Sequence, residues 1–334
     1  MQDDTPEAPE VALFHAGEIA IQIRVGRQDM AERFGRRAIH NEIPEQHRAF
    51  YSQLPFLVIG SVDEQGWPWA SLVCGRPGFA HSPEPQTLQI NAMPDSSDPL
   101  AAALKSGAPL GLLGIEMPTR RRNRLNANVA AVDSDGFTVT AVQAFGNCPR
   151  FIQTRAIEFV REPQPATAPT VVKKLDTLDD ASRQMIATAD TFFVSSYLPT
   201  EADAVTEGVD VSHRGGLPGF VKVEGNTLTI PDYSGNNLFN TLGNFLLNPK
   251  AGLIFSDFTT GNVLMLTGTV DILWEDSPEA LAFEGADRAW KFTLDHGLYL
   301  EDALPFRAEF GDYSPATLKT GHWPEAQKSA TAQL

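Results

Sequence analysis

The amino-acid sequence predicts a mainly β protein with short helices, built as two barrels in tandem. Two observations predict this fold class. The two halves of the 334-residue chain repeat the same short segments at an offset of about 141 residues, which indicates an internal duplication. Short apolar runs also alternate with turn residues, a pattern typical of strands joined in antiparallel hairpins. Closing such hairpins into a barrel removes the exposed sheet edges.

Four pairs of matching segments support the duplication. Pro77-Gly78-Phe79 corresponds to Pro218-Gly219-Phe220. Residues 87–90, 111–113 and 125–129 correspond to residues 227–230, 252–254 and 266–270. Because the pairs share nearly one register, we expect the same architecture in both halves.

Each half is expected to contain six strands and one embedded helix. In the first half, the strands are expected at 56–62, 69–73, 88–90, 110–115, 125–132 and 137–144, with a helix at 100–104. In the second half, they are expected at 192–197, 219–223, 227–230, 251–255, 263–270 and 290–295. Gly225-Asn226 is typical of a tight hairpin turn. Residues 237–247 have the apolar spacing of an amphipathic helix, which Asn248-Pro249 ends.

The order of these elements predicts two domains. The first is residues 1–162, with one or two helices within 31–53 leading into its barrel. The second is residues 171–325, with a helix within 175–188 and a short helix or loop at 276–287. The segment 162–170 is rich in Pro, Ala and Thr and is expected to be an exposed linker.

Composition and charge argue against several classes of protein. The net charge of −16 opposes the phosphate neutralisation on which nucleic-acid binding depends, so no nucleic-acid partner is expected. No apolar run reaches the roughly 18 residues of a membrane span, and the acidic start has no signal-peptide core. A cytoplasmic protein without a membrane partner is expected. The two cysteines and seven histidines lack metal-ligand spacing, so no metal site is predicted.

The second repeat carries a candidate phosphate site. Gly235 lies in the loop 231–237 that opens the predicted helix, and a helix N-terminus of this kind offers free N–H groups and a positive dipole end. Arg214 adds a full positive charge. The corresponding loop 91–98 has two aspartates and no glycine, so it should repel a phosphate. The alternative is that Ser234 and Asn236 only cap the helix.

The segment 192–258 resembles the pyridoxamine 5′-phosphate oxidase-like, FMN-binding split-barrel family. The resemblance rests on the motifs FFVSS, VSHRGGLPGFVKV and TLTIPDYSGNNLFNTLGNFLLNPKAGLIFSDF. The segment 145–152, FGNCPRFI, resembles a two-barrel subgroup described as flavin-nucleotide-binding. The resemblance implies tandem split β-barrels, each six-stranded, mostly antiparallel and Greek-key-like. It also implies non-covalent FMN, with FAD as the less suitable flavin.

The resemblance also implies site residues by their position in the motifs. A basic residue and the polar start of the helix would hold the FMN phosphate: Arg214, Tyr233, Ser234, Gly235, Asn236, Asn237, Asn240 and Thr241. The strand edge Ile230, Pro231 and Asp232 would flank the ring system, and Asn262 would bind its pyrimidine edge. A neighbouring barrel would contribute an aromatic residue and an arginine, for which the candidates are Trp290, Phe306 and Arg307. Because the family often has Arg or Lys where Asn236-Asn237 stand, phosphate binding would depend more on backbone amides.

Residues 119–124, TRRRNR, form the one dense basic run of this acidic chain. Its arginines are candidates for contacting an anionic group across a barrel interface: Arg120, Arg121, Arg122 and Arg124. The alternative is a solvated turn. Cys148 is either a reactive thiol near the flavin or, more commonly for such a residue, a small buried hydrophobe.

These features predict an FMN-dependent oxidoreductase, with a small-molecule substrate or NAD(P)H as partner. They identify no catalytic residue. Residues 304–309 lack the R-x-H-type motif through which pyridoxamine phosphate oxidases hold their substrate, so vitamin B6 oxidation is not expected. Two rival interpretations stay open, namely a non-catalytic flavin-binding or storage protein and a haem-binding split barrel. The family habit favours a homodimer, although a duplicated chain can also pair its barrels internally.

Overall fold

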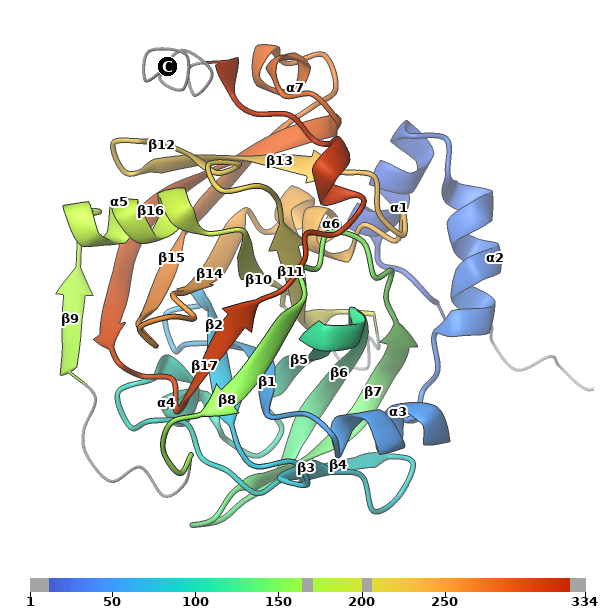
Figure 1. The fold of residues 1–334 in the computed structure, drawn as a ribbon. Helices are drawn as coiled ribbons and strands as arrows, with labels where there is room; N and C mark the ends of the chain where they lie inside the picture. The colour runs from blue at the N-terminus through green and yellow to red at the C-terminus, as the bar shows by residue number, and fades with distance from the viewer. Residues whose placement is uncertain (1–11, 164–170, 200–205, 325–334) are drawn as a thin grey trace, which may run out of the picture.

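The computed structural model describes residues 12–163, 171–199 and 206–324 (Figure 1). The first half contains α1 Ala16–Arg24, α2 Gln28–Ala38, α3 Glu45–Tyr51, β1 Phe56–Val62, β2 Pro68–Cys74, β3 Ala80–His81, β4 Thr87–Ile90, α4 Pro99–Ala103, β5 Pro109–Glu116, β6 Arg121–Val132, β7 Phe137–Gly146 and β8 Arg155–Phe159. The second half contains β9 Val171–Leu175, α5 Asp180–Thr188, β10 Thr191–Leu198, β11 Gly208–Gly215, β12 Lys222–Glu224, β13 Thr227–Tyr233, α6 Asn240–Leu247, β14 Lys250–Ser256, β15 Val263–Leu273, α7 Pro278–Ala282, β16 Ala286–Glu301 and β17 Phe306–Phe310. Among the described residues, no helix is long and apolar enough to cross a bilayer.

The two large sheets have the same strand order, which confirms the duplication. The first runs β2-β1-β5-β6-β7-β4-β3 and the second β11-β10-β14-β15-β16-β13-β12, with antiparallel neighbours throughout. The two end strands of each sheet do not pair with one another, so each barrel is split. The chain is thus a mainly β protein of two tandem split barrels.

Each of these sheets has seven strands in its path rather than the predicted six. The prediction missed β3 because it is only two residues long. It also missed β11, because its polar stretch Ser212-His213-Arg214 and the following glycines are typical of a turn. Seven of the eight residues of β11 are buried, including the polar Asp210, Ser212 and His213, so the polarity of these side chains did not indicate a buried strand.

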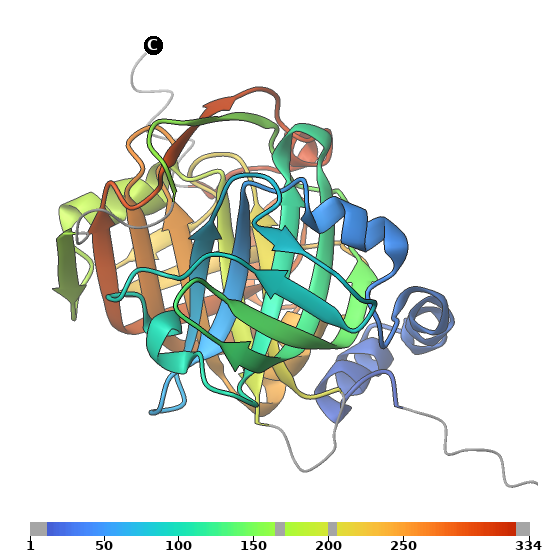
Figure 2. The same cartoon turned by 90° about the horizontal axis from the view of Figure 1, so that it is seen from below.

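The two barrels pack against each other within the one chain (Figure 2). Their contacts are related by a pseudo-twofold axis. Strand β5 packs on β11, and the equivalent pair β14 and β2 packs in the same way. A Cβ at Gly111 would lie 2.7 Å from the carbonyl oxygen of Val209, and one at Gly252 would lie 2.4 Å from that of Pro68. Gly252 and Pro68 are the repeat counterparts of Gly111 and Val209. The contacts are therefore reciprocal, as in a twofold-symmetric dimer interface.

A hydrophobic core shared by both barrels fills this interface. It includes Phe56, Val58 and Leu113 of the first barrel and Phe193, Val211 and Ile254 of the second, each at most 1% exposed. Burying apolar side chains from both halves stabilises the pairing by the hydrophobic effect. The barrels thus pair within the chain, and association of two chains stays a prediction.

Two further contacts tie the halves together. Strand β8 follows the first barrel but pairs with β17 at the end of the second, in a separate two-stranded sheet. Helix α1 packs on α6 of the second barrel, where Gly17 and Gly243 allow the two backbones to touch. The N-terminal helices therefore do more than lead into the first barrel. The predicted linker, from residue 164 on, lies outside the described residues.

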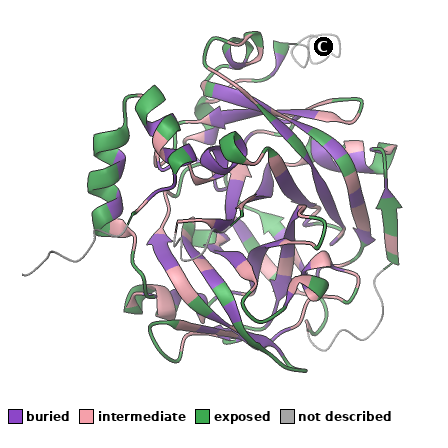
Figure 3. Ribbon diagram, turned by 180° about the vertical axis from the view of Figure 1, so that it is seen from behind, coloured by how far each residue is buried: buried purple, intermediate pink, exposed green. Residues whose placement is uncertain are grey.

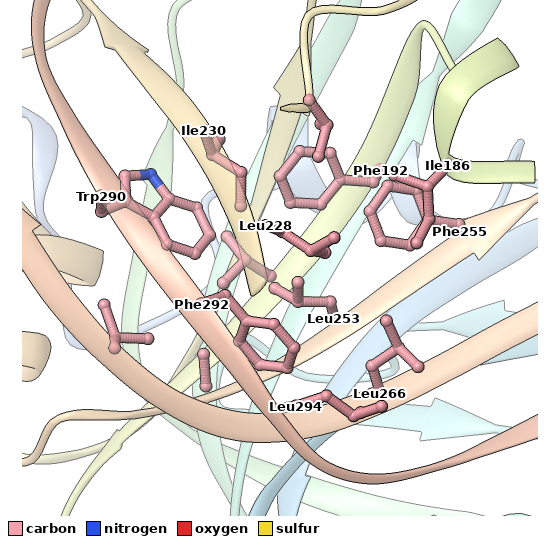
Figure 4. Packing of buried hydrophobic residues seen from close by; sticks show 14 of the residues in the cluster. Ile186, Phe192, Leu228, Ile230, Leu253, Phe255, Leu266, Trp290, Phe292 and Leu294 are labelled. Atoms are coloured by element: carbon pink, nitrogen blue, oxygen red, sulfur yellow. The ribbon is translucent and has the colours of Figure 1, made fainter. Parts of the chain in front are cut away.

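Each barrel also has a core of its own, and the sheets are buried on their inner faces while α2 is largely exposed (Figure 3). In the second barrel, Phe192, Phe255 and Trp290 converge with apolar side chains from β13, β14 and β16 (Figure 4). Helix α6 adds Leu242 and Phe245 to this core. The spacing that predicted an amphipathic helix is confirmed, and the buried face of α6 fixes where its N-terminus points.

Candidate anion site between the two barrels

A cavity of about 80 Å³ lies where the start of α6 faces strands β6 and β11. Its walls come from both barrels, because β6 belongs to the first and both β11 and α6 belong to the second. Pockets for complete ligands begin at about 300 Å³. The cavity is therefore large enough for the phosphate end of a nucleotide but not for its ring system.

The N-terminus of α6 opens into this cavity without a side-chain cap. Phe239 holds the N-cap position in the left-handed conformation, with φ of 64°, and its apolar side chain makes no capping hydrogen bond. Asn237 is also left-handed, with φ of 61°. The first N–H groups of the helix are left for another acceptor, at the positive end of the helix dipole. An anion is the complementary ligand.

Three arginines converge on the cavity. Arg122 and Arg124 alternate along β6 of the first barrel, and Arg214 comes from β11 of the second. Arg124 forms an ion pair of 3.1 Å with Asp210 and donates a short hydrogen bond to the Ser212 hydroxyl. Arg122 donates to the carbonyl oxygen of Cys148 at 2.8 Å. Of the four arginines of the basic run, Arg122 and Arg124 line this cavity.

The carboxylates beside the cavity do not balance these positive charges. Asp232 lies 3.6 Å from Arg214 but is held more closely by Arg288, at 2.7 Å. Within the described residues, Arg122 has no carboxylate partner. Burial, together with the nearby Arg124 guanidinium, lowers the pKa of Arg122 to about 9. The surroundings disfavour positive charge, so an added anion would be stabilising.

Several buried nitrogen atoms beside the cavity have no hydrogen-bond partner among the described residues. They are Nε of Arg124, Nε of Arg214 and Nε2 of His213. Burial, with Arg122 nearby, lowers the pKa of His213 well below its usual value, so the imidazole is neutral at pH 7. Buried polar atoms are normally satisfied in native proteins. These unpaired atoms are a second observation, independent of the helix, that points to a ligand.

Two of the predicted phosphate ligands use their side chains within the protein. Asn240 donates a short hydrogen bond to the buried Glu18 carboxylate of α1. Thr241 donates to the Ser212 hydroxyl at 2.9 Å. Both residues line the cavity, but they are left with their backbone N–H groups to offer a ligand.

The loop before α6 also makes hydrogen bonds within the protein. Asn236 donates to the side chain of Asn147 at 2.8 Å, and its own oxygen accepts from the N–H of Leu238 at 3.2 Å. Leu238 precedes the first residue of α6, so Asn236 orders the loop and does not cap the helix, and Ser234 is exposed outside the cavity. Tyr233, Gly235 and Asn237 line the cavity. Asn147 and His213 are site residues that sequence reasoning quoted in motifs without assigning a role.

Three predicted ligands lie away from the cavity. Trp290 is fully buried in the second core (Figure 4), so it cannot reach a ligand at the barrel interface. Asn262 donates to the Tyr299 hydroxyl at 3.1 Å, and Arg307 pairs with Asp302. None of the three lines the anion cavity, because each belongs to the opposite end of the second barrel or to its interior.

The remaining predicted residues are also accounted for by packing. Ile230 is fully buried, and Phe306 stacks on Phe56 in the shared core. Arg120 donates to the carbonyl oxygen of Ile152 at 2.9 Å, away from the anion cavity. Arg121 is exposed and lies over the Phe50 ring. Arg120 and Arg121 do not line the anion cavity, and Arg120 instead lines a separate hollow of about 530 Å³.

Space for a larger group continues beyond the anion cavity. A hollow of about 50 Å³ shares Arg122, His213, Arg214 and Tyr233 with it and is also lined by Pro231 and Cys148. A third hollow of about 530 Å³ follows, and it shares Arg150 and Phe151 with the second. Phe151 lines both of these hollows and stacks on Tyr233, with ring centroids 4.7 Å apart.

The comparisons with known proteins concern the fold. No protein-family model and no curated protein match the sequence. Solved structures match at low identity, and three of them are described here. A candidate pyridoxamine 5′-phosphate oxidase from Lactobacillus delbrueckii is 15% identical, with 32% of this chain and 95% of that one covered at a TM-score of 0.26. A Clostridium acetobutylicum protein related to general stress protein 26, of the pyridoxinephosphate oxidase family, is 17% identical over 40% of this chain and 92% of that one, with a TM-score of 0.26. HupZ of Group A Streptococcus is 8% identical over 31% and 93%, with a TM-score of 0.26.

The first barrel has a carboxylate of its own at the equivalent position. Asp98 is the N-cap of α4, as Phe239 is the N-cap of α6. Its Oδ1 accepts hydrogen bonds from the Ser71 hydroxyl at 2.6 Å and from the N–H of Leu100 at 2.9 Å. Ser71 is the repeat counterpart of Ser212 in the anion cavity. In the first barrel, the chain's own Asp98 carboxylate thus lies at the start of the helix. In the second barrel, a ligand would supply the corresponding negative charge.

This carboxylate predicts a pH dependence of stability. Burial raises the pKa of Asp98 from 3.8 to about 6. Because the folded protein holds this proton more tightly than the unfolded chain, the stabilisation is present below about pH 4 and is lost as the pH rises to about 6. Asp98→Asn keeps an N-cap oxygen but has no titration. Urea unfolding should show wild type losing about 2–3 kcal/mol relative to this variant across that window, and parallel pH profiles would contradict the assignment.

Proposed function

We propose that this chain binds FMN non-covalently, with the phosphate in the cavity between the barrels, and that it works as an FMN-dependent oxidoreductase. The observation that supports this most directly is the convergence of Arg122, Arg124 and Arg214 on an uncapped helix N-terminus. Two independent sources of positive potential meet there, and neither is fully neutralised by protein. A phosphate dianion satisfies both.

The residues present fit the phosphate group of FMN. Free N–H groups of α6 and the unpaired nitrogen atoms of Arg124, Arg214 and His213 border the cavity. Arginine forks suit phosphate oxygens, and Arg122 has no competing carboxylate in the described part of the chain. The protein would thus hold the phosphate with groups from both barrels, so that FMN binding depends on their pairing.

The ring system needs the space beyond Tyr233 and Phe151. The large hollow there is lined by Arg150, Ser234 and Thr320, among others, and its volume of about 530 Å³ falls within the range of ligand pockets. Phe151 lines this hollow and stacks on Tyr233, so an aromatic face lies beside the proposed ring site. When bound, FMN would supply hydride transfer. The chain's own residues bind, orient and shield the cofactor, with a small molecule or NAD(P)H as the partner.

Binding measurements with two flavins test the phosphate assignment. FMN should bind more tightly than riboflavin, which has the same ring and no phosphate. Arg214→Ala should weaken FMN binding by about 1.5–3 kcal/mol, or about 10-fold to 150-fold, and should leave riboflavin binding unchanged. Arg121→Ala is the matched control, because Arg121 is exposed on the same strand as Arg122 and outside the cavity. Equal affinities for the two flavins would refute the proposed site.

Reduction kinetics separate the enzyme from its rivals. If the chain is an oxidoreductase, NADPH, NADH or a reduced substrate should reduce the bound flavin within the time of one catalytic turnover. The loss of flavin absorbance measures this reduction. Bound flavin that no reductant reaches would instead indicate a storage protein. A protein that takes up haem and no flavin would show a haem spectrum and would overturn the proposal.

A further inference from the structure

The pseudo-twofold axis creates a second cavity between the barrels, at the counterpart of the anion site. Its volume is about 440 Å³. Arg124 pairs with Leu113 in the first sheet, and Met265 pairs with Ile254 in the second at the equivalent register. Val263 likewise stands where Arg122 stands. Met265 and Val263 line this second cavity as the two arginines line the first.

Where the anion site has its arginines, the second cavity has apolar side chains. Besides Val263 and Met265, these include Leu72 and Cys74 of β2, Ile254 of β14, Leu300 of β16 and Leu304. The rest of the lining is acidic or polar and includes Asp95, Asp98, Glu162, Glu301 and Asp302. Burial raises the pKa of Cys74 to about 12, so its thiol is neutral at pH 7 and adds to the apolar wall. Val263 and Met265 therefore offer no positive charge to a phosphate in the places where Arg122 and Arg124 do so in the anion site.

One carboxylate at this cavity is buried without a matching cation. Asp98 lines the cavity and is 8% exposed. Both of its hydrogen bonds in the described chain are accepted by Oδ1, which leaves Oδ2 for a ligand. Among the residues that the structure describes, Arg161 is the one basic residue lining the cavity, and it forms an ion pair of 3.0 Å with Asp302. No basic group is among those that shift the pKa of Asp98, and a pKa of about 6 leaves the carboxyl mostly charged at pH 7.

We propose that this second cavity binds a small apolar amine, with its ammonium group on Asp98 and its hydrocarbon part against Val263, Met265 and Leu300. The volume lies within the range of small-molecule pockets. A buried carboxylate favours a cation that also donates hydrogen bonds, and the apolar wall favours a hydrocarbon or aromatic body. The two halves of the duplicated chain would then hold ligands of opposite charge in equivalent places. This inference does not depend on FMN binding.

Calorimetric titration of the full chain at pH 7 with three probes tests the charge preference. The probes are 4-phenylbutylamine, 4-phenylbutanol and 4-phenylbutyrate, which share a body and differ in the charge of the end group. We expect the amine to bind at least tenfold more tightly than the alcohol, and the acid to bind least. Equal binding of the amine and the alcohol, or no binding of any probe, would overturn the proposal.

Two variants locate the binding. Asp98→Asn should remove the preference for the amine over the alcohol, whereas Asp133→Asn, a matched change in an exposed turn, should preserve it. Val263→Phe fills the cavity from its apolar wall and should weaken all three probes at least tenfold, which tests the site even if Asp98→Asn does not fold. An amine preference that survives Asp98→Asn would place the binding elsewhere and overturn the assignment.

Discussion

Phe239→Asp is expected to weaken FMN binding about a hundredfold relative to Phe239→Asn. The substitution gives α6 the N-cap carboxylate that α4 already has in Asp98. Phe239 lines the anion cavity, so the new carboxylate would lie within a few ångströms of a bound phosphate. Repulsion between charges about 5 Å apart near a protein surface is worth about 3 kcal/mol, which corresponds to that factor.

Phe239→Asn is the matched control for this experiment. Both variants lose the same aromatic side chain and its contact with Arg288, 5.2 Å from the ring, and both new residues tolerate the left-handed backbone. The difference between them isolates the charge. Without ligand, the Asp variant should also be the more stable at neutral pH, because its carboxylate faces unbalanced arginines. Fluorescence titration with FMN measures the first effect, and equal affinities would show that the phosphate does not lie at this helix.

Arg155→Met is expected to lower the free energy of unfolding by about 3–5 kcal/mol. Arg155 on β8 donates to both carboxylate oxygens of Asp190, at 2.6 and 2.7 Å, and both residues are at most 8% exposed. The pair joins the strand after the first barrel to the residue before β10 of the second. Removing the arginine leaves a buried carboxylate without its partner, which is far more costly than losing an exposed ion pair.

A double variant shows whether the lost stability comes from the unpaired, buried Asp190 carboxylate or from lost packing. Arg155→Met combined with Asp190→Leu removes both charges and should recover most of the stability lost by the single variant. Arg76→Met breaks an exposed ion pair with Glu162 and should change stability little. Urea unfolding of all three proteins measures the difference. If the single and double variants are equally destabilised, the effect comes from packing against Phe258 rather than from the charge.

Much of the fold can be predicted from the sequence because its signals are local. Strand β1 is observed at the predicted residues 56–62, and the Gly225-Asn226 turn joins β12 to β13 as expected. The apolar spacing in 237–247 lies in α6, whose described helix begins at Asn240. The duplication was visible as repeated segments, and repetition of strand order follows because similar sequences bury similar faces.

Only the part of the candidate site that lies within one segment of the chain could be predicted from the sequence. The uncapped start of α6 and Arg214 are close in sequence and lie together, so the proposed phosphate site was foreseeable on that side. Trp290 is a case that the sequence could not predict. An aromatic side chain on a strand can face either the barrel core or a ligand site, and the sequence does not show which of the two it faces. Its full burial depends on Phe192 and Phe245, which come from other elements.

Residues a few positions apart are enough to predict most of the strands, helix α6, the repeat and the chemical contrast between the two helix starts. The packing of the folded chain, by contrast, determines that the barrels pair within the chain, that β8 joins β17, and that Arg122 and Arg124 reach the second barrel while Val263 and Met265 reach the first. These contacts depend on the pseudo-twofold packing of two sheets. That packing is set by the combined shape of many distant side chains, and no single segment encodes it.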